Sequence, residues 1–362
     1  MSSAFDPVTF TRGPAMPNRL MLAPLTNSQS HVDGVLSHEE FTWLTMRAEG
    51  GFGLTMTCAA HVQAIGQGFP GQMGIWSDAH LDGLTRLATA LNASGTVSYA
   101  QLHHAGNRSP MDLTGQQPVC PSDDPSTGAR ALTTAEVPEL IADFVAAAVR
   151  AEQAGFHGVE LHGAHGYLIC QFLSPELNLR DDEFGGSLEN RSRVLFAIVD
   201  GIRAACGPDL ALAVRLSPER FGIRTEEIVE VYQRLVASGQ VDFIDMSLWD
   251  VDRRLPDGEF EGRSLIEIFA ELPRGEVRLG VAGKIHDPAD VQRVLDAGVD
   301  IAVLGRVGIL HHDYPQLLEQ DDAFVPRRPP VTPEVLVAEG VSPKFVTYLS
   351  GSFKGFVDQS SR

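Results

Sequence analysis

The stretch LIADFVAAAVRAEQAGFHGVELHGAH, residues 140–165, decides the fold because it holds a complete helix–strand unit. Apolar residues recur at helical spacing from Leu140 to Val149, and Ala154-Gly155 ends the pattern as a helix stop. A short apolar strand, residues 158–161, follows and runs directly into His162. An amphipathic helix beside a short, mostly apolar strand is typical of a parallel α/β protein.

Further short apolar segments recur along the chain, and amphipathic patterns such as Leu81 to Leu91 and Ile228 to Val236 separate them. The segments expected to be strands are 21–23, 54–57, 97–100, 158–161, 211–214, 243–246, 277–281 and 301–304. Eight strand–helix units predict a single (β/α)8 TIM barrel with extended loops at its C-terminal face. We place this barrel at residues 1–325 and expect the aromatic-rich extension 326–362 to pack on it.

Composition and charge exclude several classes of protein. A formal charge of −19 argues against binding to nucleic acid or to anionic membranes. No apolar run reaches the length of about 18 residues that a membrane span needs, and the N-terminus lacks the features of a signal peptide. The four cysteines are scattered, which argues against iron–sulfur and zinc-knuckle sites. We therefore expect a cytoplasmic protein. The sequence leaves open whether the protein forms a homo-oligomer.

Polar residues or glycines stand at the ends of six expected strands, and these ends share one rim of a barrel, where barrel active sites are built. Two long connections, 103–134 and 163–187, also follow strands and so lie on this face. The strand-end residues are Pro24-Leu25-Thr26, Gln101, His162, Arg215, Gly283 and Gly305-Arg306.

The two glycines after the last two strands match a phosphate site. Glycine lets the backbone N–H groups of Gly283 and Gly305 approach an anion closely, and Arg306 or Lys284 adds charge. These residues predict a phosphorylated cofactor or substrate.

The pair His162 and His165 is the sharpest feature of the chain, because both imidazoles follow one strand and point toward the barrel mouth. We favour hydrogen-bond donors to a substrate carbonyl or oxyanion over metal ligands and over structural histidines. No carboxylate or cysteine stands nearby at ligand spacing, so no metal is predicted. Tyr167 supplies a proton in the functional interpretation and packs the rim in the structural one.

Three other motifs carry little weight. Residues 66–71 fit the Gly-x-Gly-x-x-Gly dinucleotide pattern, but Pro70 and no helix follow, so we interpret them as a loop. The pair His103-His104 is interpreted as structural, although His103 is close enough to line the site. The pair His311-His312 is expected in a surface loop.

The residues of this rim, taken in order, resemble the Old Yellow Enzyme family of FMN-dependent NAD(P)H oxidoreductases, over about residues 18–314. This chain departs from the family at Ser28, near which an aromatic residue is common, and at Phe184, where a tyrosine is common, so we expect the shape of its substrate pocket to differ. The matching stretches are 18–19, 23–26, 101–106, 158–168, 171–175, Asn178, Arg180, Asp182, 185–187 and 189–191.

The resemblance implies non-covalent FMN, with NADPH or NADH as reductant. It places the flavin ring against the residues Ala23, Pro24, Leu25, Thr26, Ala59 and Gln101. Arg215 would lie beside N1 of the ring, and Gly283, Gly305 and Arg306 would hold the phosphate. His162 and His165 would bind the substrate carbonyl, with Tyr167 as the proton donor. The implied reaction is ping-pong reduction of an activated C=C bond in an α,β-unsaturated carbonyl compound.

Three alternatives remain open from the residues alone. An FMN enzyme of this kind could instead oxidise an amine or demethylate a substrate. A sugar-phosphate aldolase or isomerase is less favoured, because Schiff-base chemistry needs a lysine and only Lys284 is near the rim. A non-catalytic flavin-binding protein would hold FMN without turnover.

Overall fold

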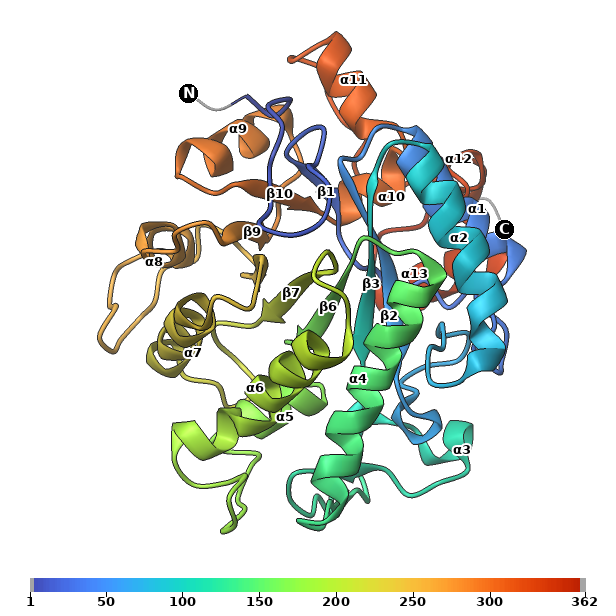
Figure 1. Ribbon diagram of the computed structural model, residues 1–362. Helices are drawn as coiled ribbons and strands as arrows, with labels where there is room; N and C mark the ends of the chain where they lie inside the picture. Colours follow the sequence, from blue (N-terminus) through green and yellow to red (C-terminus); the bar gives the residue numbers. More distant parts are fainter. Residues whose placement is uncertain (1–2, 359–362) are drawn as a thin grey trace.

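The computed structural model describes residues 3–358 and contains a closed barrel of parallel strands surrounded by helices (Figure 1). The strands follow the order β1-β10-β9-β8-β7-β6-β3-β2 around the barrel. They are β1 (Leu20–Leu22), β2 (Leu54–His61), β3 (Val97–His103), β6 (Gly158–Gly163), β7 (Ala211–Leu216), β8 (Phe243–Ser247), β9 (Arg278–Ala282) and β10 (Ile301–Leu304). The predicted (β/α)8 barrel is confirmed.

One helix packs outside the barrel after each strand, as the amphipathic patterns predicted. These helices are α1 (His38–Glu49), α2 (Leu81–Ala93), α4 (Glu136–Ala154), α6 (Leu188–Ala205), α7 (Thr225–Ser238), α8 (Leu265–Glu271), α9 (Pro288–Asp296) and α10 (Arg306–Leu310). Local chemistry fixes their ends: the Ser37 hydroxyl accepts a hydrogen bond from the Glu40 N–H at the start of α1. Gly155 ends α4 in the left-handed conformation with φ of 91°.

Apolar side chains fill the interior of the barrel at its N-terminal end. Met21, Met56, Tyr99 and Phe243 lie in one buried apolar cluster inside the strands. The ring of Phe10, from the N-terminal segment, lies 6.4 Å from that of Tyr99 and 6.3 Å from that of Phe243. Because the N-terminal end of the barrel is closed in this way, cavities of the barrel open at the C-terminal ends of the strands.

Several strands extend further than the sequence indicated. Gln101, His162 and Arg215 were expected just after their strands, whereas each lies inside one, in β3, β6 and β7. The pairing between β6 and β7 continues beyond the apolar residues of these strands, so that His162 lies opposite Arg215. The side chains therefore stand on rigid backbone, which holds their positions better than a loop does.

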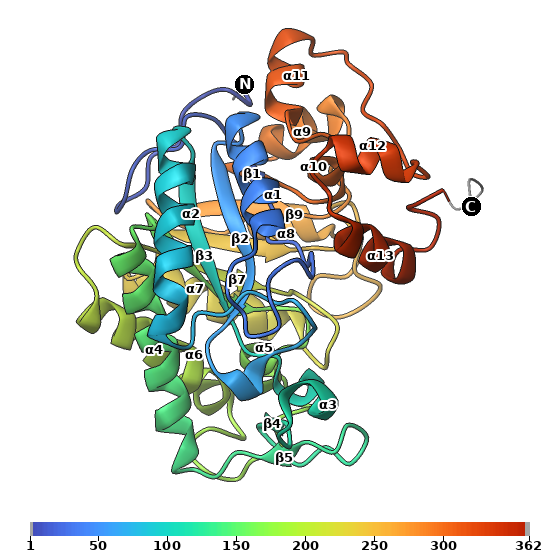
Figure 2. The same ribbon diagram turned by 90° about the vertical axis from the view of Figure 1, so that its right-hand side faces the viewer.

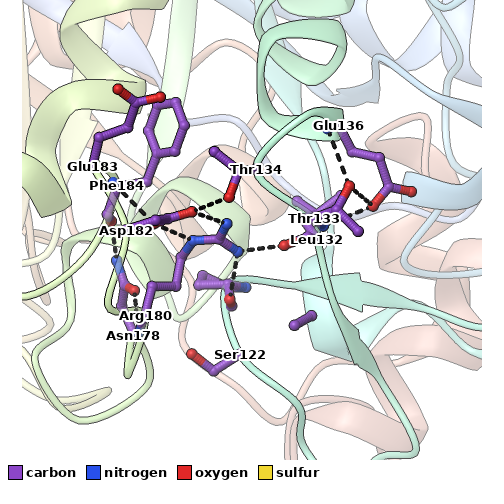
Figure 3. Close-up of polar contacts among 12 residues, drawn as sticks. Ser122, Leu132, Thr133, Thr134, Glu136, Asn178, Arg180, Asp182, Glu183 and Phe184 are labelled. Carbon is purple, nitrogen blue, oxygen red and sulfur yellow. Dashed lines mark hydrogen bonds and ion pairs between the residues drawn. The ribbon is translucent and has the colours of Figure 1, made fainter.

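The two long connections on the C-terminal face are joined to one another (Figure 3). The first holds η3 (Gly106–Arg108), α3 (Met111–Thr114), β4 (Val119–Cys120) and β5 (Arg130–Ala131), and the second holds α5 (Leu168–Leu173). The Arg180 guanidinium donates to the carbonyl oxygens of Leu132 and, at 2.9 Å, Pro121. Asp182 pairs with Arg180 and accepts from the Thr134 hydroxyl at 2.6 Å. These contacts tie the loop after His165 to the loop after His103.

The described part of the C-terminal extension lies against the barrel, while residues 359–362 of that extension lie outside the described residues. Its helices α12 (Pro333–Ala338) and α13 (Pro343–Ser352) lie side by side (Figure 2). The buried ring of Phe345 meets Trp43 of α1 edge-on at 5.0 Å. Helix α11 (Tyr314–Gln320) precedes this segment. No helix within residues 3–358 is both long and apolar enough to cross a bilayer.

Two minor motifs have different outcomes. The stretch 66–71 opens no helix: η1 (Ala64–Gly66) ends there, and η2 (Asp78–His80) begins only later, so its interpretation as a loop is confirmed. The surface position expected for His311 is wrong. That ring is buried, and its Nε2 accepts from the backbone N–H of Arg327 at 2.8 Å, because the extension covers it.

Candidate active site

Two adjoining cavities open at the C-terminal ends of the strands, with volumes of about 560 and 570 Å³. They share the lining residues Pro24, Leu25, His165, Trp249, Ile309 and Phe353. Every predicted site residue lines at least one of them. Thr26, Ala59, Gln101, His162 and Tyr167 line the first cavity, and Ala23, Arg215, Gly283, Gly305 and Arg306 line the second. The structure thus brings together residues from seven barrel strands and their loops.

A buried layer of polar side chains lies at the base of these cavities. The Gln101 amide donates to Glu160 Oε1 at 2.7 Å, and Arg215 Nε lies 3.1 Å from Asp245 Oδ2. Glu160 Oε2 and Arg215 Nε are buried without a hydrogen bond of good geometry. Such orphaned groups are costly. Of the two residues, Arg215 lines the second cavity and is where a polar ligand edge would be expected.

Glu160 and Asp245 face the same arginine and oppose each other's ionisation. Burial first, and then the charge of Asp245, raises the pKa of Glu160 to about 8. Burial also raises the pKa of Asp245, while Arg215 works in the opposite direction. The pair therefore holds a proton at neutral pH, and one negative charge remains to balance Arg215.

The far end of the second cavity has the character of an anion site. A Cβ added at Gly283 would lie 3.0 Å from the backbone nitrogens of Asp250 and Val251, so only glycine lets these segments approach so closely. Gly305 immediately precedes α10, and Arg306 is exposed beside it. The ammonium group of Lys284 also lines this end, where it pairs with Asp250 at 2.7 Å.

His162 and His165 face each other across 3.2 Å, measured from Nε2 to Nδ1. The backbone N–H of Ala164 donates to Nδ1 of His162 at 3.3 Å, which leaves the proton of a neutral His162 on Nε2. Nε2 of His165 lies 2.7 Å from the Ser247 hydroxyl. His165 has a φ of 61°, and its backbone N–H is held by Ser217 Oγ at 3.0 Å. These hydrogen bonds thus fix the orientation of both imidazole rings.

Both rings are neutral at physiological pH. Burial lowers the pKa of His162 well below its usual value, with His165 and Arg215 adding to the effect. Burial, and then the charges of Arg215 and Arg108, does the same for the pKa of His165. Neutral imidazoles donate one hydrogen bond each and do not compete with Arg215 for an anion.

Tyr167 stands next to the histidines and immediately precedes α5. Its ring meets that of His103 edge-on at 4.4 Å and that of His162 at 5.0 Å. His103 itself does not line the cavity. It is fully buried, and Gln72 Nε2 lies 3.0 Å from its Nδ1. The buried His103 ring therefore packs against the Tyr167 ring and helps to hold it in place.

Several cavity residues were missed from the sequence. Ser247 ends β8, so the rule of polar strand ends would have found it had that strand been included. Tyr348 and Phe353 belong to the aromatic group of the extension, where packing was expected, and they reach the first cavity from α13 and the residue after it. Phe221 and Trp249 lie in loops with φ of 53° and 61°, which no sequence pattern marked.

Comparison with known proteins identifies the family. Residues 3–323 match the sequence profile of the NADH:flavin oxidoreductase / NADH oxidase family. The chain belongs to this family. It is 37% identical over 312 residues to "Probable NADH-dependent flavin oxidoreductase YqiG" of Bacillus subtilis, covering 83% of this chain and 84% of that protein. It is 38% identical over 314 residues to an NADPH dehydrogenase of Geobacillus, covering 83% and 89%.

Solved structures of the family have the same fold. The Old Yellow Enzyme homologue from Zymomonas mobilis superposes with a TM-score of 0.80 at 29% identity, over 96% of this chain and 99% of that chain. Morphinone reductase in complex with tetrahydroNAD gives a TM-score of 0.77 at 28% identity, over 93% and 94%. The chain is an FMN-dependent NAD(P)H oxidoreductase of the Old Yellow Enzyme type.

The residues that line the two cavities fit FMN. The two cavities adjoin, with Pro24 and Leu25 lining both, and the second has an anion end at Gly283 and Gly305. The buried Arg215 lines the second cavity, and its Nε, which lacks a hydrogen bond of good geometry, lies 3.1 Å from Asp245 Oδ2. A phosphate at one end and a planar, hydrogen-bonding ring at the other match this distribution of groups.

Proposed function

We propose that this flavoenzyme reduces the activated C=C bond of α,β-unsaturated carbonyl compounds, with NADH or NADPH as the reductant. The observation that carries the proposal is the convergence of the two neutral histidines, 3.2 Å apart, beside Tyr167 in one cavity. This arrangement offers two donors for a carbonyl oxygen and one acid for the neighbouring carbon.

We assign the cofactor residues as follows. Gly283, Gly305 and Arg306 would hold the FMN phosphate, and Arg215 would lie beside the pyrimidine edge of the flavin ring, near N1. Bound FMN supplies a two-electron relay that takes hydride from NAD(P)H and passes it to the acceptor. The residues that would line the flavin ring are Ala23, Pro24, Leu25, Thr26, Ala59 and Gln101, all of which line the two cavities.

The histidines act on the acceptor carbonyl. The Nε2–H of His162 and the Nδ1–H of His165 donate to the same oxygen when Ser247 donates to Nε2 of His165. Negative charge grows on that oxygen as hydride arrives at the β-carbon, so both bonds strengthen in the transition state. Each contributes roughly 1.5–3 kcal/mol, and together they accelerate the step about 10²–10⁴-fold.

Tyr167 completes the reaction by protonating the α-carbon. Its phenol stands in the same cavity as the histidines, where it can serve as a general acid. Because NAD(P)H and the acceptor would use one cavity, we propose that they bind in turn, in a ping-pong sequence.

Steady-state kinetics test this function. With NADH and cyclohexenone both varied under anaerobic conditions, we expect cyclohexanone as the product and parallel double-reciprocal lines. Intersecting lines would contradict the ping-pong order. Oxidation of NADH without formation of saturated ketone would contradict the reduction of C=C bonds.

A further inference from the structure

Arg108 occupies an unusual position on the wall of the first cavity. It is the last residue of η3, is exposed and lines the cavity. Its guanidinium carbon lies 4.4 Å from the centre of the Tyr167 ring, and its Nη1 donates to the carbonyl oxygen of His165 at 2.7 Å. The stacking and the hydrogen bond fix the guanidinium plane beside two of the proposed catalytic residues.

Arg108 sets the charge of this cavity. Within residues 3–358, it is the one charged side chain among the lining residues, since both histidines are neutral and no acid lines the cavity. The described residues place no carboxylate at ion-pair distance from it, whereas Lys284 in the second cavity is paired with Asp250. An unneutralised arginine on a pocket wall, in a protein with a formal charge of −19, attracts anions locally.

We infer that Arg108 recognises a carboxylate carried by the acceptor, so that the preferred substrates are anionic α,β-unsaturated carbonyl compounds. The inference rests on the proposed function and adds the substrate class. Because Arg108 lies over the ring of Tyr167, the carboxylate extends from the α-carbon side of the double bond. The carbonyl oxygen remains on the histidines.

The geometry favours recognition over a purely structural role. The bond to His165 uses one N–H, while a guanidinium carries five donors in a planar fork that matches a carboxylate. Tethering at Nη1 and stacking on Tyr167 reduce the rotamer entropy that the side chain would otherwise lose on binding an anion.

A matched substrate pair tests the inference. The probes are cyclohexenone with a carboxymethyl group on the α-carbon and the corresponding primary amide, which is neutral and of similar shape. For the wild type we expect a higher kcat/KM with the acid than with the amide. Arg108→Gln should lower the acid-to-amide ratio about 10–100-fold, because a charge-assisted hydrogen bond is lost. Arg108→Lys should keep part of the ratio.

Arg86→Gln is the control variant. Arg86 is also exposed and lies with its guanidinium carbon 4.7 Å from the centre of the Phe41 ring, but it belongs to α2 and lines neither cavity. We expect this variant to keep the wild-type ratio. If Arg108→Gln slows both substrates equally, the residue merely supports the loop and the inference is wrong. If it raises the KM for NADH and leaves the ratio unchanged, Arg108 binds the coenzyme and the inference is also wrong.

Binding without turnover gives a second readout. Calorimetric titration of the oxidised enzyme should show that 2-hydroxyphenylacetate, whose carboxymethyl group is next to the phenolic carbon as in the α-substituted enone, binds more tightly than 2-hydroxyphenylacetamide. Arg108→Gln should remove the difference. Equal affinities in the wild type would overturn the inference. Failure of the proposed function is distinguishable, because unsubstituted cyclohexenone would then not be reduced at all.

Discussion

The hydroxyl of Ser247 lies 2.7 Å from Nε2 of His165, on the side of the imidazole that faces away from His162. Ser247 ends β8, and His165 follows β6, so two strands of the barrel fix this contact. When the hydroxyl donates, the proton of neutral His165 stands on Nδ1, next to the Nε2–H of His162. Ser247 thus selects the tautomer that offers two donors to one oxygen.

Replacement of Ser247 tests this role. Ser247→Ala should weaken the binding of para-substituted phenols to the oxidised enzyme by about 10-fold, the cost of one lost hydrogen bond. The variant should still bind FMN, because the hydroxyl contacts His165 and the residues assigned to the cofactor are unchanged. Ser247→Thr retains a hydroxyl and should recover most of the affinity. Equal loss in the alanine and threonine variants would show that packing, and not the hydroxyl, matters.

The histidine pair is tested by removing both rings. If the two histidines bind an oxyanion, para-substituted phenols should bind the oxidised wild-type enzyme and give a long-wavelength charge-transfer band. In the His162→Ala, His165→Ala double variant we expect this band to disappear while FMN stays bound. Reduction of cyclohexenone should fall about 10²–10⁴-fold, since two bonds to the developing oxyanion are lost. Full phenol affinity in the double variant would assign the histidines to structure instead.

Tyr167→Phe should separate the two halves of the reaction. Hydride transfer from NADH to the flavin needs no proton from the phenol, so the bleaching of the flavin absorbance should stay within a few-fold of the wild-type rate. Its return on mixing with cyclohexenone should slow about 10²–10⁴-fold, because the α-carbon lacks its acid. Stopped-flow absorbance measures both steps. Equal slowing of both would identify Tyr167 as a packing residue of the rim.

Glu160 gives a prediction about pH and stability. Its pKa is raised from 4.5 to about 8 in the folded protein, so its stabilising contribution is complete below about pH 4.5 and is lost as the pH rises through 8. Glu160→Gln removes this titration. The wild type should lose on the order of 1–4 kcal/mol more of its free energy of unfolding than the variant between about pH 5 and pH 8.5.

Urea unfolding at several pH values, with FMN in excess, measures this difference. The exposed Glu319→Gln is the matched control and should follow the wild type. Parallel pH profiles for the wild type and Glu160→Gln would show that Glu160 is ionised in the folded protein at neutral pH, contrary to the proton-sharing arrangement with Asp245.

The barrel and the rim of the site were predictable because their signals are local. Each buried strand is a short apolar run, and the polar residue near its end, such as Gln101 or Arg215, stands out against it. Strand lengths were less predictable, because the backbone pairing of His162 with Arg215 is a contact between strands and leaves no mark on either sequence.

The rest of the site depends on contacts between distant segments. Tyr348 reaches the first cavity because Phe345 anchors the extension on Trp43, and neither residue signals this from the sequence. Trp249 has a positive φ that its residue type does not favour, so the loop that bears it could not be placed in advance. Arg108 could not be distinguished from other surface arginines before its ring contact with Tyr167 was seen.

An anaerobic single turnover tests whether the enzyme passes electrons from NADH through the flavin to the C=C bond of cyclohexenone. Purified enzyme is first titrated with one equivalent of NADH, and the visible absorbance of the oxidised flavin is followed while cyclohexenone is added. We expect that NADH bleaches the absorbance, that cyclohexenone restores it, and that one equivalent of cyclohexanone forms per flavin. Absorbance that returns only on admission of oxygen, with cyclohexenone recovered unchanged, would contradict this expectation.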